Sequence, residues 1–145
     1  MKKSFYIFLL STLYFAGVSQ NCDTTVTIKQ KQYKKYHKKI QKGKSISYKY
    51  ADLLFAISSY VRQQGDTTYK KWYNVTLDLY KQGFDHCRKN ISLKQLQLYK
   101  MGLCYFYIED YESATTYFSK TIASRCENPC VQYYLSLSQQ KENRK

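Results

Sequence analysis

Apolar residues recur at three- and four-residue steps along most of the chain after residue 45. The first series is Ile46, Tyr50, Leu53, Leu54, Ile57 and Val61. This spacing places the side chains on one face and predicts a helix. Gly65 fits a helix C-terminal cap, and Asp66 or Thr67 fits the N-cap of a second helix that ends near Gly83.

A third helix is predicted from Ser92 to about residue 108. Ser92 and Gln95 fit a capping box, and Ile91 and Leu96 stand at the two positions of a hydrophobic staple. A short acidic corner then leads to a fourth helix over residues 111–124.

Asn128 followed by Pro129 predicts the start of a fifth helix, because proline is favoured at the first helical position. The chain contains a single proline, and this scarcity favours long uninterrupted helices. The expected fold class is therefore all-α, with two stacked helical hairpins and a C-terminal helix that caps them.

The first residues have the composition of a secretory signal. Two lysines precede an apolar run over residues 5–15, and small residues follow at Ala16, Gly17 and Ser19. Residues 1–19 are therefore predicted to be a cleaved signal peptide, which gives a secreted or periplasmic protein. The run is shorter than the roughly twenty residues that span a bilayer. Two alternatives remain open, namely an uncleaved membrane anchor and a lipoprotein signal acylated at Cys22.

Lysine is concentrated just after this leader. Residues 24–51 contain nine lysines and no acidic residue, in a chain whose net charge is +14. The chain therefore divides into a signal peptide, a basic segment over residues 20–45 and a helical domain over residues 46–145. The candidate basic patch consists of Lys34, Lys35, Lys38, Lys39 and Lys42.

Such a patch attracts anions, so an acidic polysaccharide, a membrane surface or an acidic protein is a possible partner. Nucleic acid is not expected, because a secreted protein rarely meets it. The alternative is that the lysines are solvated and mainly aid solubility.

Five cysteines follow the predicted leader, so an oxidising compartment permits two disulfides and one thiol. Cys126 and Cys130 flank the predicted corner at residues 128–129, which favours a bridge between them. Zinc is not expected, because the two histidines, His37 and His86, belong to no cluster with ligand spacing.

Residues 95–128 resemble one tetratricopeptide repeat, a 34-residue helix–turn–helix unit. Gly102 and Ala114 match positions where this family has small residues, so that its two helices approach closely. Tyr105 and Phe118 match its aromatic positions. Other matches are Leu98, Met101, Thr121 and Ile122, and the sequence departs from the family at Cys126, where a proline is usual.

The resemblance implies a binding function, because the first helix of each such repeat lines a groove that holds a peptide or a partner protein. The corresponding residues here are Leu96, Tyr99, Leu103, Phe106 and Tyr107. Their apolar character would suit an apolar or helical segment of another protein. In so short a stack, the same residues could instead belong to the core.

Catalysis is not expected. The sequence has no histidine paired with a nucleophile, no glycine-rich phosphate loop and no spaced pair of carboxylates on one helix face. No cofactor is therefore expected. The main hypothesis is an exported interaction module that acts as an adaptor or accessory subunit of a larger assembly. The alternatives are a secreted anion-binding module that uses the lysines, and a membrane-anchored subunit.

Overall fold

A computed structural model describes residues 22, 26–84 and 90–144 of the chain. Within these residues the regular elements are all helical, which confirms the predicted all-α class. They are α2 (Gln30–Gln41), the 3-10 helix η1 (Tyr48–Tyr50), α3 (Ala51–Gln63), α4 (Tyr69–Phe84), α5 (Ile91–Tyr107), α6 (Tyr111–Ala123) and α7 (Pro129–Glu142). The predicted signal peptide, residues 1–19, lies outside the described residues.

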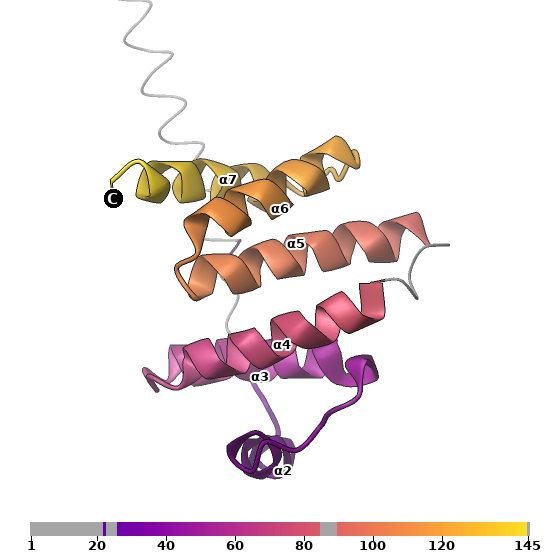
Figure 1. The fold of residues 1–145 in the computed structure, drawn as a ribbon, viewed down its shortest axis with the longest axis vertical. Helices are drawn as coiled ribbons and strands as arrows, with labels where there is room; N and C mark the ends of the chain where they lie inside the picture. The colour runs from indigo at the N-terminus through magenta and orange to yellow at the C-terminus, as the bar shows by residue number, and fades with distance from the viewer. Residues whose placement is uncertain (1–21, 23–25, 85–89, 145) are drawn as a thin grey trace, which may run out of the picture.

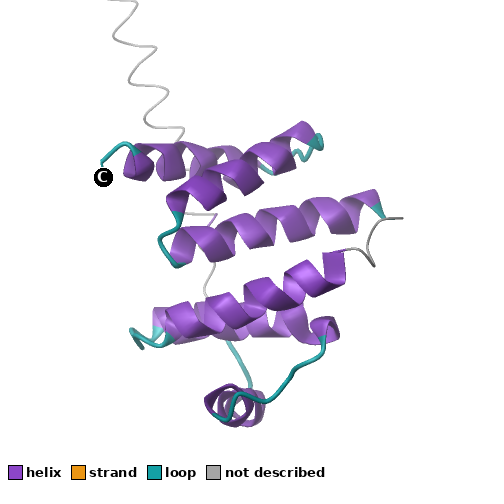
Figure 2. Ribbon diagram, viewed as in Figure 1, coloured by secondary structure: helices purple, strands orange, loops and turns teal. Residues whose placement is uncertain are grey.

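The helices from α3 to α7 form a stack in which each helix packs on the next one along the chain (Figure 1). Helices α3 and α4 form one hairpin, α5 and α6 form a second, and α7 covers the far end. Helix α2 lies beyond the first hairpin and is seen almost end-on in this view. Loops connect the helices and also lie before α2 and after α7 (Figure 2). No described helix is both long enough and apolar enough to cross a membrane.

Two of the predicted helix boundaries follow from local hydrogen bonding. Gly65 adopts a φ of 72°, a left-handed conformation that glycine allows at the end of α3. Asp66 Oδ1 then accepts a hydrogen bond from the Thr68 amide at 2.9 Å. At the start of α7 the Asn128 side chain accepts from the amide of Cys130, also at 2.9 Å. The predicted caps at Gly65 and Asn128 are confirmed, whereas α4 begins at Tyr69, later than an N-cap at Asp66 or Thr67 predicts.

Two other boundaries differ from the prediction. The cap of α5 is Asn90, whose side chain accepts from the Leu93 amide at 3.0 Å, so the capping box at Ser92 is wrong. The expected staple is also absent, because Ile91 is 72% exposed. Helix α3 begins at Ala51 rather than at residue 46, since residues 43–47 are not helical.

The core consists of two apolar clusters that meet at α5. The first joins α2, α3 and α4 with Met101 and Cys104, and the second joins α5, α6 and α7. Gly102 lies so close to α6 that a Cβ atom there would stand 2.6 Å from a ring carbon of Phe118. Phe118 and Ala114 are fully buried. The predicted close approach of the two helices is therefore confirmed.

A polar link joins three helices around Asp52. Its carboxylate accepts a hydrogen bond from the Tyr80 hydroxyl at 2.7 Å and pairs with Lys100 Nζ at 2.8 Å. Partial burial raises the pKa of Asp52, but the hydrogen bonds from Lys100 and Tyr80 outweigh it and hold the pKa below its usual value. The link therefore connects α3 with both α4 and α5.

The predicted Cys126–Cys130 bridge is wrong. Cys130, in the first turn of α7, is bonded to Cys22, and their Cα atoms are 5.5 Å apart. Cys126 is a free, half-buried thiol. Proximity in space decides a disulfide, and here it brings together two cysteines separated by 108 positions. The bond also uses the sulfur that acylation of Cys22 would require.

Candidate functional site

The predicted groove residues all lie on α5, the central helix of the stack, but they differ in exposure. Tyr99 and Leu103 are buried, at 9% and 7% exposed. Phe106 and Tyr107 are half-buried, and Leu96 is 42% exposed. Leu96 is thus the only one of the five that presents much of its surface to solvent.

The aromatic members of this set pack against the last two helices. Tyr99 contacts Phe118 with ring centroids 6.1 Å apart, and Phe106 contacts Tyr134 edge-on at 5.2 Å. The hydroxyl groups of Tyr107 and Tyr134 lie 2.9 Å apart. These rings therefore hold α5 to α6 and α7, a structural role that accounts for their size and polarity.

A small hollow of about 150 Å³ is lined by residues of α3 and α5 and is called here the α3–α5 hollow. Residues near the N-terminus line part of it, and the Val26 amide donates a hydrogen bond to Gln63 Oε1 at 3.1 Å. The hollow is smaller than the roughly 300–1,000 Å³ typical of pockets for drug-sized ligands. Its lining residues are Cys22, Val26, Phe55, Ser59, Tyr99, Lys100, Leu103 and Tyr107.

A second hollow, of about 250 Å³, is called here the α2 lysine hollow, because all of its described lining residues are lysines. Three of its residues lie on α2, and a fourth directly follows that helix. They recur at three- and four-residue steps, which places them on one side of the helix. The five lysines are Lys35, Lys38, Lys39, Lys42 and Lys44.

The turn after α2 explains why Lys44 joins the other four. Gly43 has a φ of 62°, and its amide donates to the carbonyl of Ile40 at 3.1 Å. The Lys44 amide then donates to the carbonyl of Lys39 at 3.0 Å, so the chain turns back on the helix. Lys34 is exposed on α2 but does not line the hollow. Sequence analysis missed Lys44, although Gly43 was a signal for this turn.

The opposite side of α2 is fixed in the core. Tyr36 and Ile40 are 2% and 4% exposed. Tyr33 and His37 both stack on Trp72, with ring centroids 6.0 and 5.8 Å away. The lysines are thus carried by an anchored helix.

No carboxylate pairs with the five lysines among the described residues. The ion pairs found there join Lys70 to Glu109 and Lys100 to Asp52, each at 2.8 Å. Like charges held together repel one another, and this repulsion is relieved when an anion binds. The hollow is therefore a cluster of positive charge for which the described structure holds no paired carboxylate.

Groups for metal or covalent chemistry do not come together in the described part of the chain. No set of three histidine, cysteine or acidic side chains is placed to hold a metal ion there. Cys104 is fully buried, and burial raises the pKa of its thiol, so it stays protonated and unreactive. His86 and Cys87 lie outside the described residues.

Comparison of this chain with protein-family models, with curated proteins and with solved structures gives no match.

Proposed function

We propose that this protein is a non-catalytic binding module that holds an extended polyanion on the lysines of α2. The observation that carries the proposal is the α2 lysine hollow, which five lysine side chains line and where no described carboxylate pairs with them. If the leader exports the protein as expected, an acidic polysaccharide is the polyanion that it would meet.

The anchoring of α2 favours this partner over a lipid bilayer. An amphipathic helix that binds a membrane inserts its apolar face, and binding strength grows with the apolar area inserted. The apolar face of α2 is not available for insertion, because Tyr36 and Ile40 are buried against the first hairpin. A partner therefore meets ammonium groups and not an apolar face.

Binding to a heparin oligosaccharide, a linear polyanion, tests the proposal. Five lysine contacts predict a steep salt dependence, with a log–log slope of roughly −3.5 to −4.5 if counterion release resembles that on nucleic acids. The variant K35Q/K38Q/K39Q/K42Q should bind at least tenfold more weakly and with a shallower slope. Its folding should be unchanged, because three of these lysines are exposed and the fourth is half-buried.

The matched control is K29Q/K31Q/K49Q/K71Q, which removes the same charge from four exposed lysines outside the hollow. It should keep most of the affinity of the unaltered protein. Equal loss in both variants would mean that only net charge matters, and the proposed site would then be abandoned.

A second candidate function is protein binding at α5, the helix expected to line a groove, where Leu96 is exposed. Leu96→Asp should abolish association with a partner without altering thermal melting. The double variant Tyr99→Ala/Phe106→Ala tests whether these two rings belong to a groove or to the core. A lowered melting temperature would show that they serve the core. Normal partner binding by a stable Leu96→Asp protein would exclude this candidate.

A further inference from the structure

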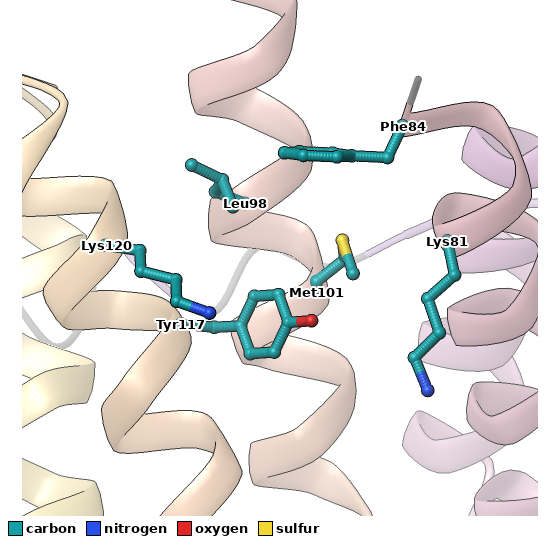
Figure 3. Close-up of a pocket in the computed structure, with 6 residues that line it drawn as sticks. All are labelled: Lys81, Phe84, Leu98, Met101, Tyr117 and Lys120. Carbon is teal, nitrogen blue, oxygen red and sulfur yellow. The ribbon is translucent and has the colours of Figure 1, made fainter. Parts of the chain in front are cut away.

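A third hollow lies on the side of the stack that α4 and α6 form, away from both surfaces discussed above. It measures about 260 Å³ and is called here the α4–α6 hollow. Its residues come from three helices and are drawn in Figure 3. They are Lys81 and Phe84 from α4, Leu98 and Met101 from α5, and Tyr117 and Lys120 from α6.

The base of this hollow is apolar and well fixed. Leu98 and Met101 are 7% and 3% exposed and project from α5 into the middle of the space (Figure 3). Phe84 and Tyr117 are half-buried beside them. A methylene chain laid on this base would exchange contact with water for contact with four apolar or aromatic groups.

Two ammonium groups flank the apolar base. Lys81 and Lys120 lie on opposite sides of Met101 in Figure 3. Lys120 Nζ stands 4.9 Å from the centroid of the Tyr117 ring, and Lys81 Nζ stands 5.5 Å from that of Tyr105. A hydrogen bond with Tyr105 raises the pKa of Lys81, so this group stays cationic at neutral pH. Each ammonium group therefore lies beside an aromatic ring of α5 or α6.

The described side chains that line the hollow carry positive charge only. Among these residues Lys81 and Lys120 are charged and none is acidic. Asp78, one turn before Lys81 on α4, is the carboxylate whose charge acts on Lys81, and it is exposed and outside the lining. A third cation, Lys94, stands 5.5 Å from the centroid of the Phe84 ring. An apolar ligand with a negative group is therefore the chemistry that matches.

We propose that the α4–α6 hollow binds a small amphiphilic carboxylate, with its alkyl chain on Leu98, Met101 and Phe84 and its carboxylate held by Lys81 and Lys120. The volume limits the ligand to a chain of medium length, because it is below the roughly 300–1,000 Å³ of pockets for drug-sized ligands. This site shares no residue with the α2 lysine hollow, so the inference is independent of the function proposed above.

Octanoate is the probe, followed by calorimetry and by backbone amide NMR on the full chain. We expect saturable binding, with the largest shifts at the lining residues of α4, α5 and α6. Hexanoate should bind about fifteenfold more weakly, since each methylene buried in an apolar site contributes about fourfold. Octan-1-ol should bind at least tenfold more weakly than octanoate, and octylamine should not bind.

The variant K81Q/K120Q should weaken octanoate binding about tenfold and leave heparin binding unchanged. Both lysines are exposed, so the variant is expected to fold. The control K49Q/K71Q removes the same charge elsewhere and should bind octanoate normally. The proposal is overturned if binding of octanoate does not saturate at millimolar concentration. It is also overturned if the amide chemical-shift changes that octanoate causes map to α2. Equal binding of octan-1-ol, or unchanged binding by K81Q/K120Q, also overturns it, as does occupation by an acidic apolar peptide and not by octanoate.

Discussion

Replacing Cys22 by serine removes the covalent link between the N-terminal residues and α7. The bond closes a loop whose ends are 108 positions apart. In the chain-entropy model, a crosslink that closes a loop of about 100 residues destabilises the unfolded state by about 4.7 kcal/mol. Measured effects are commonly 2–4 kcal/mol, because the unfolded chain retains some structure. We expect Cys22→Ser to lose about 2–4 kcal/mol of unfolding free energy.

Equilibrium unfolding in urea measures this loss, with the protein prepared under oxidising conditions. The unfolding free energy of Cys130→Ser should equal that of Cys22→Ser, and the double variant should be no less stable than either single variant. All three variants lose the same single disulfide bond. Adding a reductant to the unaltered protein should reproduce the same loss. Because domains are stable by only about 5–15 kcal/mol, the change is large enough to measure with confidence.

Cys126→Ser is the control, since this half-buried thiol is not bonded in the structure. It should leave unfolding nearly unchanged. The reasoning is refuted if Cys22→Ser is as stable as the unaltered protein while Cys126→Ser and Cys130→Ser are both destabilised. Non-reducing peptide mapping that recovers a Cys126–Cys130 peptide would refute it as well.

Three further changes test local features of the stack. Gly102→Ala should destabilise by about 1–3 kcal/mol in thermal melting, because the new methyl group meets the fully buried Phe118 ring and this outweighs the roughly 1 kcal/mol gained in helix propensity. Asn128→Ala should cost about 1 kcal/mol in urea unfolding through loss of the α7 cap. Asp52→Asn should cost at most about 1 kcal/mol at neutral pH, since this carboxylate is largely exposed and its bond to Lys100 is partly screened. The folded pKa of Asp52 is lowered, so the stability from its charge is present above pH 4 and is lost as pH falls through that pKa. The difference between Asp52→Asn and the unaltered protein should therefore shrink in acid unfolding curves.

The sequence alone was sufficient for features that depend on neighbours within a few positions. Apolar spacing predicted the hairpins and the final helix, because apolar residues that share one face of a helix recur every three or four positions along the sequence. Gly65 and Asn128 marked helix ends because each acts on amides or carbonyls one turn away. The close helix contact at Gly102 was expected from the resemblance to the repeat family, which has small residues at this position.

Tertiary structure decided which of several plausible local signals operates. Asn90 and Ser92 are both good capping residues, and in the folded chain it is the Asn90 side chain that accepts from the Leu93 amide. The lysines of α2 were visible as a series. Their enclosure of one hollow, however, required burial of Tyr36 and the turn at Gly43.

Contacts between distant residues could not be read from the sequence. Cys130 had a near candidate in Cys126, yet folding of the whole stack brings Cys22 to it. Tyr99 has the same amphipathic chemistry in a groove and in a core, and only its packing on Phe118 distinguishes the two. The α4–α6 hollow draws its residues from three helices, so no single stretch of sequence contains it. Helix formation is local, whereas burial and enclosure depend on which surfaces meet when the helices pack.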